Sequence, residues 1–313
     1  MGSGDAMLEG QRILVTGGSG NLGGEIVCSL APSNTVYAAA RFGRAGDRDY
    51  VMRAGAVPVV HRLGADLLSA LPDDIDYVFN FGAILPGGAN KAGSTVEASM
   101  EEAGRVNAQA AGEIMRRWPK LKGFVFASSS TVYQYQPKPL NERDAVGANF
   151  GTYSATKYAG EQVASFAAGL YGIPTLILRI FHSYGPRGGP VTDRIRMVAD
   201  GRPVPVRSPG PNIACPLYSE DFVRIMLTAL HQASVPPLVM NIGGDPVAQE
   251  DYVAMIGAQL GIEPVWAPNP AMNPSPQADT TLMRRIAGPP RISVEEGIRR
   301  AIAFNFPDGV RRR

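Results

Sequence analysis

The chain has 313 residues and a formal charge of +2, a balance that gives it no general electrostatic attraction to nucleic acid. Hydrophobic residues make up 45% and charged residues 19%, a globular composition with enough apolar material for one large or two small cores. The two cysteines, Cys28 and Cys215, lack metal-ligand spacing and cannot form a disulfide framework, so we expect a reducing cytoplasm and no metal site.

Membrane and export segments are also not expected. No apolar run approaches the length of a membrane-spanning helix, and residues 1–7 lack the basic start and apolar core of a signal peptide. We therefore expect a small-molecule substrate as the partner, with neither membrane nor nucleic acid involved.

The first predicted element is an apolar strand at residues 12–16 that runs directly into a glycine-rich turn. Glycines at 17, 20 and 23 follow, and then residues 25–30, which are predicted to be helical. The first glycine permits a tight turn, the second lets backbone amides approach a pyrophosphate, and the third allows close packing of helix on strand. A second strand at 34–40 completes the order expected of a dinucleotide-binding unit, although such a turn also occurs without a ligand.

Strand-like and helix-like segments alternate through the first 180 residues. The predicted strands are 13–16, 35–40, 57–61, 77–81, 123–128 and 175–181, and the clearest helices are 101–118 and 153–171. Strands that are apolar throughout are typical of a sheet covered on both faces. The sequence therefore predicts an α/β fold with a doubly wound parallel sheet, the Rossmann arrangement.

The composition of the chain changes after residue 181, where proline and glycine become frequent between short predicted helices. We expect a smaller C-terminal substrate-binding region at 182–212 and 243–313. The dinucleotide-binding domain would comprise 1–181 and be rejoined by about 213–242.

A tyrosine and a lysine stand at the start of the predicted helix 153–171. Tyr153 and Lys157 are four residues apart and lie on one helix face. An ammonium beside a phenol favours the phenolate, so we expect Lys157 to lower the pKa of Tyr153 from about 10 toward neutrality. Such a pair can move a proton on or off an alcohol oxygen. This spacing alone is common in helices, but it indicates an acid/base pair more strongly because the same chain contains the glycine-rich turn.

Several stretches along nearly the whole chain together match one family. They are Thr16-Gly17-x-x-Gly20-x-x-Gly23, Asp66-Leu67, Gly82-Ala83, Val106-Asn107, Ser128-Ser129-Ser130, Tyr153-x-x-x-Lys157, Leu178-Arg179-Ile-Phe-His182-Ser-Tyr184-Gly185-Pro186-Arg187 and Ser219-Glu-Asp221. In these stretches the chain resembles the extended short-chain dehydrogenase/reductase family, which includes sugar-nucleotide epimerases and dehydratases.

The resemblance implies a role for each matching residue. Tyr153 would be the catalytic acid/base, Lys157 its partner and a ligand of the nicotinamide ribose, and Ser129 the hydroxyl that binds the substrate oxygen. The implied cofactor-binding residues are Gly17, Ser19, Gly20, Asn21, Leu22, Gly23, Asp66, Leu67, Phe81, Gly82, Ala83, Asn107, Ala127, Tyr153, Lys157 and Phe181.

The chain departs from the family's pattern at the end of the second strand. An acidic residue commonly holds the adenosine ribose there, whereas this chain has Ala40 followed by Arg41 and Arg44. Two guanidiniums and no carboxylate favour a 2′-phosphate, so we expect NADP in preference to NAD, unless both arginines are simply solvated.

A second departure concerns the substrate. His182 stands where sugar-nucleotide enzymes usually have Asn, and it could be a pocket residue, a proton donor or a core histidine. The arginine of their Arg-Asp-Phe stretch corresponds to Ala214, which removes a bidentate contact to a diphosphate. With His182, the candidate substrate contacts are Ser130, which could instead only end a strand, and Arg187.

These residues predict an NAD(P)-dependent oxidoreductase that transfers a hydride between nicotinamide and a secondary alcohol or ketone. The alternative is a nucleotide-sugar epimerase that uses transient internal oxidation. Dehydration is less favoured, because no Asp-Glu pair follows Ser129, and a non-catalytic NADP-binding protein is least favoured. The resemblance also implies a homodimer, since many relatives pair through the helices that correspond to 101–118 and 153–171. Both are rich in alanine, which permits close helix approach but also suits packing against the helix's own sheet.

Overall fold

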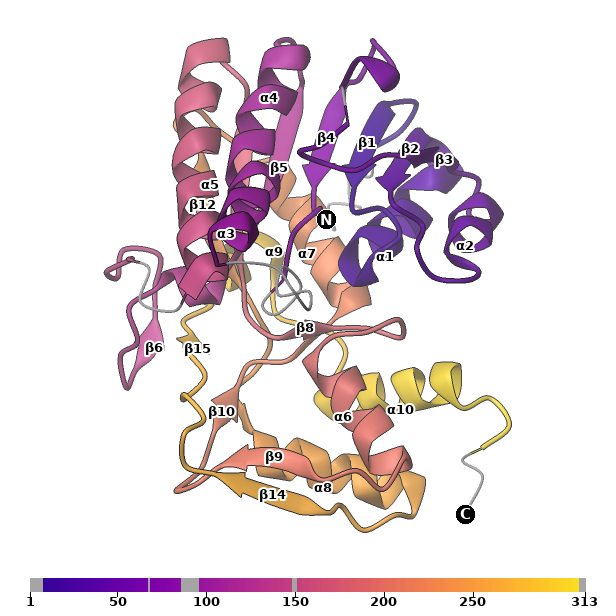
Figure 1. Cartoon of the computed structure of the whole chain (residues 1–313), viewed down its shortest axis with the longest axis vertical. Helices are drawn as coiled ribbons and strands as arrows, with labels where there is room; N and C mark the ends of the chain where they lie inside the picture. The colour runs from indigo at the N-terminus through magenta and orange to yellow at the C-terminus, as the bar shows by residue number, and fades with distance from the viewer. Residues whose placement is uncertain (1–7, 67, 86–95, 148–150, 310–313) are drawn as a thin grey trace, which may run out of the picture. The chain divides into compact units, whose positions relative to one another are not determined.

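The structure, a computed structural model, describes residues 8–66, 68–85, 96–147 and 151–309 (Figure 1). The chain divides into two compact units: residues 1–134, 142–179 and 223–240 form the first, and 135–141, 180–222 and 241–313 the second. Within the described ranges, no helix combines the length and apolar character needed to cross a membrane. The cytoplasmic location expected from the sequence stays a prediction.

A seven-stranded sheet organises the first unit, and its strand order is β12-β7-β5-β4-β1-β2-β3. The pairs β1–β2, β1–β4, β2–β3 and β4–β5 are parallel. The chain therefore winds outward from β1 in both directions, which confirms the predicted doubly wound sheet. The strands are β1 (Arg12–Thr16), β2 (Thr35–Ala40), β3 (Val57–Val60), β4 (Tyr77–Asn80), β5 (Gly123–Ser129), β7 (Thr175–Ile180) and β12 (Leu238–Ile242).

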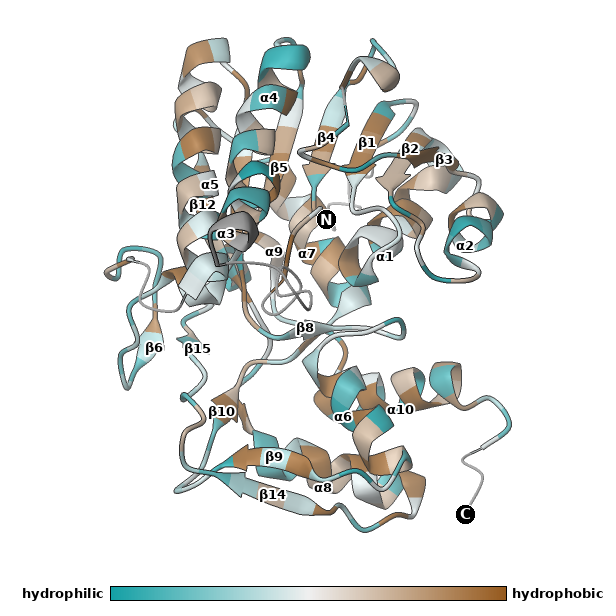
Figure 2. Cartoon of the chain, in the orientation of Figure 1, coloured by the Kyte–Doolittle hydropathy of each residue, from teal (hydrophilic) through white to brown (hydrophobic). Residues whose placement is uncertain are grey.

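The helices of this unit include the predicted ones, one of them interrupted, together with α2 (Asp47–Arg53) and α7 (Ser219–Leu230), which were not predicted. A π-helical turn, Arg105–Gln109, separates α3 (Val96–Gly104) from α4 (Ala110–Arg117), so the predicted helix 101–118 is not continuous. The other helices are α1 (Asn21–Leu30) and α5 (Gly151–Tyr171). In Figure 2 the strands carry hydrophobic segments, whereas α2 is mostly hydrophilic, as expected for a helix at the surface.

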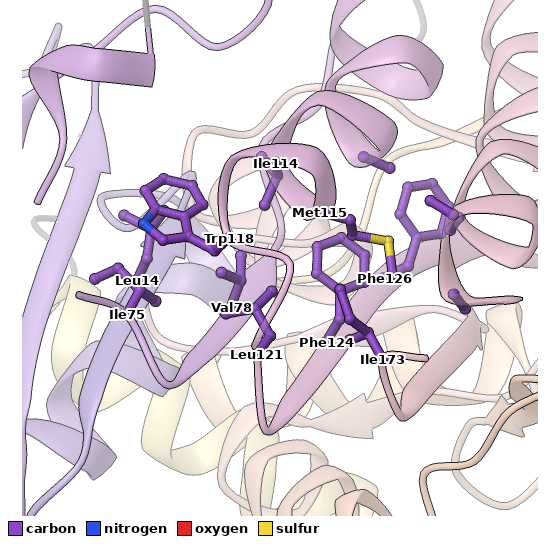
Figure 3. Close-up of a cluster of buried hydrophobic side chains, with 14 of the residues drawn as sticks. Leu14, Ile75, Val78, Ile114, Met115, Trp118, Leu121, Phe124, Phe126 and Ile173 are labelled. Carbon is purple, nitrogen blue, oxygen red and sulfur yellow. The ribbon is translucent and has the colours of Figure 1, made fainter. Parts of the chain in front are cut away.

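A cluster of buried side chains holds α4 and α5 against the sheet (Figure 3). Phe124 and Phe126 on β5 pack with Ile114 and Met115 on α4, and all four are almost completely buried. Trp118 closes one end of the cluster, and its Nε1 donates to the carbonyl of Pro72 at 3.0 Å, so its single polar group is satisfied. This packing fixes α5 beside the carboxyl end of β5.

The second unit contains short strands around a helical core. Its apolar cluster includes Ile195, Val204, Val253, Ile256 and Ile298, all completely buried. The helices are α6 (Pro190–Ala199), α8 (Gln249–Leu260), α9 (Thr281–Ala287) and α10 (Val294–Asn305). The paired short strands are β6 (Pro139–Leu140) with β15 (Gln277–Ala278), β8 (Ser183–Tyr184) with β11 (Leu217–Tyr218), β9 (Val204–Arg207) with β14 (Trp266–Asn269), and β10 (Ile213–Ala214) with β13 (Val247–Ala248).

Candidate active site

The glycine-rich turn between β1 and α1 can be built only with glycine at two of its positions. Gly17 has a φ of +67°, and a Cβ there would lie 2.8 Å from the backbone nitrogen of Gly82. A Cβ on Gly23 would collide with the carbonyl oxygen of Gly17. The missing side chains thus let the turn, the helix and the segment after β4 approach one another closely.

Side-chain hydrogen bonds join the ends of β1 and β4, the two strands at which the strand order reverses. The Thr16 hydroxyl donates to Asn80 Oδ1 at 2.7 Å and accepts the N–H of Gly82 at 3.1 Å. In doubly wound sheets ligands bind beyond the carboxyl ends of the strands at such a reversal. The predicted cofactor residues Phe81, Gly82 and Ala83 follow β4 at this edge.

The start of α1 offers donors and an acceptor that a ligand would satisfy. Gly20 occupies the N-cap without a side-chain hydrogen bond, so the first amides of α1 point outward as an anion site. Asn21 Oδ1 is buried with no hydrogen-bond partner in the described structure. A helix start without a side-chain cap and a buried oxygen without a partner fit a dinucleotide. Ser19 and Leu22 flank the same turn.

The segment after β2 carries the two arginines expected to select the cofactor. Arg41 is exposed, and Phe42 adopts a left-handed backbone with a φ of +49°. Arg44 Nη2 donates to the Ser19 carbonyl at 3.3 Å, and its Nε lies 3.6 Å from Asp47 Oδ2. The Arg44 guanidinium therefore reaches the glycine-rich turn, although part of its charge is already paired.

Two further candidate cofactor-binding residues, Asp66 and Phe181, lie outside the glycine-rich turn. Asp66 accepts hydrogen bonds from the Arg62 backbone at 2.7 Å and from Arg62 Nε at 3.0 Å. These bonds lower the pKa of the Asp66 carboxyl, which therefore stays ionised. Phe181 is fully buried in the second unit, where its N–H donates to Ile242 O at 2.8 Å. Leu67 lies outside the described residues.

The three predicted catalytic residues meet at the contact between β5 and α5. Ser129, the last residue of β5, is hydrogen-bonded to the Tyr153 side chain. Lys157, one turn further along α5, donates from Nζ to the carbonyl of Ala127 at 2.7 Å. Ser129 Oγ also accepts the N–H of Thr131 at 3.2 Å, which fixes its position at the strand end.

The expected effect of Lys157 on the Tyr153 phenol is wrong for this structure. Burial raises the pKa of Tyr153, and the hydrogen bond from Ser129 opposes that rise. Helical spacing brings Lys157 to the correct face, but its ammonium donates to a backbone carbonyl and not to the phenol. Burial also lowers the pKa of Lys157 to about 8, with the Glu161 charge opposing the change.

Asn107 fixes the loop after β4 against α5. Its Oδ1 accepts the N–H of Ile84 at 2.8 Å, while its Nδ2 donates to Ile84 O and to Thr156 Oγ1, both at 3.0 Å. The side chain is buried in the π-helical turn. In this structure Asn107 therefore joins two parts of the candidate site through protein contacts.

A buried ion pair near the predicted catalytic residues was missed in the sequence analysis. Glu161 on α5 accepts from Arg179 Nε at 3.0 Å and Nη2 at 2.8 Å, and from the Ser128 hydroxyl at 2.5 Å. The two side chains are only 3% and 7% exposed. Two signals could have found them: Glu161 continues the four-residue spacing of Tyr153 and Lys157, and Arg179 is the one charge in an apolar strand. We call the pairs Ser129–Tyr153, Ala127–Lys157 and Ser128–Glu161 the contact row.

The candidate substrate residues occupy different parts of the structure. Ser130 is buried directly after β5. In the second unit, His182 has a left-handed backbone with a φ of +51°, and its Nδ1 accepts the N–H of Cys215 at 3.5 Å. Burial lowers the pKa of His182 to about 4, so its imidazole is neutral near pH 7. Such a strained non-glycine residue is typical of functional positions.

Two other observations bear on ligands of the second unit. Ala214 is buried in β10, so no guanidinium stands at this position, and Arg187 is partly buried in the turn before α6. Among the described residues, no cluster of three or more His, Cys, Asp and Glu side chains could hold a metal ion. The first unit therefore places a phenol, a serine hydroxyl and a lysine ammonium at the contact between β5 and α5.

Comparison with protein families gives one match that covers most of the chain: the model of the NAD dependent epimerase/dehydratase family matches residues 13–243. The UDP-glucuronate 4-epimerase of Thermodesulfobacterium geofontis (strain OPF15) is 26% identical over 208 residues, which cover 59% of this chain and 59% of the relative. The UDP-N-acetyl-alpha-D-glucosaminuronate decarboxylase of Bacillus cytotoxicus is 25% identical over 320 residues, covering 94% and 97%. The chain spans between 57% and 63% of the length of the first curated relatives that it matches.

Solved structures share the fold. The UDP-glucuronic acid 4-epimerase from Bacillus cereus, in complex with UDP-glucuronic acid and NAD, has a TM-score of 0.81 and 21% identity to this chain. The alignment covers 94% of this chain and 98% of that one.

Proposed function

The chain belongs to the NAD-dependent epimerase/dehydratase family, and from that premise we propose that it epimerises a nucleotide sugar through transient oxidation of one secondary alcohol. The observation that carries this proposal is the Ser129–Tyr153 hydrogen bond, with Lys157 one turn further along the helix. The names of the relatives, which include UDP-glucuronate 4-epimerases, support the sugar class. The second unit would bind the substrate.

The chain's own residues would act on the proton. When bound, a nicotinamide dinucleotide would supply the chemistry of hydride transfer: one hydride from the sugar carbon, returned to the opposite face of that carbon. Tyr153, as its phenolate, would take the proton from the sugar hydroxyl, and as the neutral phenol it would give that proton back when the carbonyl is reduced again. Ser129 would hold that oxygen within reach of the phenol, and the Lys157 ammonium would stabilise negative charge nearby.

We propose NADP as the preferred cofactor, with NAD as the alternative. Support comes from Arg41 and Arg44, which follow β2, and from Ala40, which supplies no carboxylate. Arg44 already contacts the glycine-rich turn through Ser19 O. A phosphate accepts charge-assisted hydrogen bonds from guanidinium groups more strongly than a ribose hydroxyl does.

The test is to incubate the purified protein with NADP or NAD and a panel of UDP-sugars, including UDP-glucuronic acid. We expect a second sugar epimer by chromatography and no net change in nicotinamide absorbance. The Tyr153→Phe protein is the control for background conversion. A panel that yields no epimer with either cofactor would contradict the proposal.

A second candidate function is net oxidation of an alcohol or reduction of a ketone that carries no nucleotide. Ala214 favours it, because a guanidinium at that position would give a bidentate contact to a diphosphate. The same assay separates the two, since simple ketones would then change the nicotinamide absorbance while UDP-sugars would not react.

A further inference from the structure

Glu161 connects the catalytic face of α5 to a neighbouring strand of the sheet. On α5, Tyr153, Lys157 and Glu161 follow one another at intervals of four residues and contact Ser129, Ala127 and Ser128 of β5. Arg179 lies on β7, the strand beside β5, and its guanidinium donates hydrogen bonds to both carboxylate oxygens of Glu161. Its guanidinium also lies over the Tyr133 ring, 4.7 Å from the centroid.

Resting on the role proposed above for Lys157, we propose that Glu161 is a positioning residue of the active site. Clamped by Arg179, it holds Ser128 and therefore the neighbouring Ser129 against α5, and it keeps the Lys157 ammonium charged at a buried position.

Apart from Glu161, few groups stabilise the charged form of Lys157. Its Nζ contacts a neutral carbonyl and lies 5.2 Å from the centroid of the Phe126 ring, and the side chain is 2% exposed. Burial of this kind disfavours an ammonium, whereas a carboxylate one helical turn away favours it. The Glu161 charge acts in this direction on the pKa of Lys157.

The groups on the surrounding elements do not replace Glu161. Strand β5 has no ionisable side chain, and the π-helical turn presents the Asn107 amide to α5. Its one cation, Arg105, is paired with Glu101 at the surface. The charged residues of α4 are Glu113 and Arg116, both exposed, and Arg117, which is paired with Asp73. Tyr133 and Tyr153 are the nearby phenols, and Arg179 is bound to Glu161 itself.

Bidentate pairing satisfies the hydrogen-bonding capacity of the buried Glu161 carboxylate. Two parallel N–H···O bonds from one guanidinium satisfy both oxygens, and the Ser128 hydroxyl adds a third bond. Burial opposes the charge of Arg179, but its hydrogen bonds to Glu161 outweigh burial and raise the pKa of Arg179, so the guanidinium stays charged over the range in which Lys157 titrates. The Glu161 carboxylate thus stands one helical turn from Lys157 with both of its oxygens held by hydrogen bonds.

The test is a direct titration of Lys157 in the full chain without substrate or cofactor. The sequence has only five lysines, so protein labelled with ¹³C at lysine Cε gives a spectrum in which Lys157→Met assigns the resonance. We expect a midpoint near pH 8 in the wild type. In Glu161→Gln we expect it to fall by roughly one unit or more, the effect of losing a nearby opposite charge.

Matched variants separate this role from a purely structural one. Glu296→Gln removes a carboxylate paired with Arg299 and Arg300 in the second unit, and Ser128→Ala removes only the hydroxyl contact; both should leave the Lys157 midpoint unchanged. A folded Glu161→Gln protein that loses thermal stability but titrates Lys157 near pH 8 overturns the proposal.

A double variant keeps the test informative if Glu161→Gln does not fold. Glu161→Gln/Arg179→Gln removes both buried charges together, and we expect a Lys157 midpoint below the wild type but above the single variant. A midpoint equal to the wild type in the double variant also overturns the proposal in that case. The titration needs no turnover, so an absence of epimerase activity would count against the proposed function and not against this role.

Discussion

The contact row and the segment after β2 belong to the same unit, but the structure holds them in very different ways. In the contact row, the side chains of α5 have hydrogen-bond partners on β5 at distances such as 2.5 and 2.7 Å, and most of them are buried. After β2, Arg41 is exposed and the Arg44 side chain is 61% exposed. Proton transfer requires groups held in place, whereas attraction of a phosphate tolerates mobile surface cations.

The largest expected effect is on the contact row. Tyr153→Phe removes only the phenolic hydroxyl, so we expect turnover to fall by about 100-fold or more while cofactor binding stays close to wild type. Steady-state kinetics and a cofactor titration measure the two quantities. Tyr158→Phe, which deletes a hydroxyl from the same helix, is the control and should keep full activity. If Tyr153→Phe retains more than about a tenth of the rate, Tyr153 is not the acid/base.

Lys157→Met should damage both turnover and cofactor affinity, and pH distinguishes its role from simple packing. The wild-type ammonium loses its proton as pH rises through about 8, so cofactor affinity should fall above that pH. The affinity of Lys157→Met should already be low and should not change over this range. Isothermal titration at several pH values measures both.

Stability of the cofactor-free protein should move in the opposite direction. The folded pKa of Lys157 lies below the ordinary 10.5, so the folded state binds fewer protons than the unfolded state between pH 8 and 10.5. The free energy of unfolding contributed by Lys157 therefore increases with pH in this window, by at most roughly 1.4 kcal/mol per pH unit. Denaturant unfolding of the wild type, with Lys157→Met subtracted, checks the sign. An equal pH dependence in both proteins would contradict it.

A smaller effect is expected after β2. Arg41→Ala/Arg44→Ala should weaken NADP binding by about tenfold or more, since a hydrogen bond to a charged group contributes about 1.5–3 kcal/mol. NAD binding should change little. Titration of both cofactors by intrinsic fluorescence measures the ratio, and raising the salt concentration should reduce it because these charges are exposed. Tighter binding of NAD than of NADP by the wild type would contradict the proposed preference.

The two regions also differ in what the sequence could predict. The glycine-rich turn and the Tyr153–Lys157 spacing are local patterns, since each depends on residues within about one helical turn or one strand–helix junction. The Glu161–Arg179 pair is not local, because it depends on β7 lying beside β5 in the sheet. The π-helical turn was missed for a similar reason. A Cβ on Gly160 would collide with the Asn107 carbonyl, so close packing of α5 accompanies a distortion that periodicity does not contain.

The inner and outer faces of α5 differ in the same way, since one is buried in its own unit and the other is exposed. We propose that the outer face forms a homodimer interface. Ala164, Ala167 and Ala168 pack into the core of their own unit, so they do not provide the close contact expected from the sequence. The exposed apolar side chains are instead Phe166 and Leu170, at 73% and 61% exposure. Isolated exposed hydrophobics are normal at protein surfaces, but two at helical spacing on one face can form a two-fold contact.

Light scattering at micromolar concentration tests the dimer, since a mass near the single-chain 33.2 kDa would contradict it. Phe166→Glu/Leu170→Glu should convert a dimer to a monomer, because the pairing of like charges across a two-fold axis opposes association. Phe304→Glu, at a residue of α10 that is 53% exposed, is the matched control and should leave the mass unchanged. Because the same helix carries Tyr153 and Lys157, we expect the monomeric variant to lose part of its activity, although less than Tyr153→Phe loses.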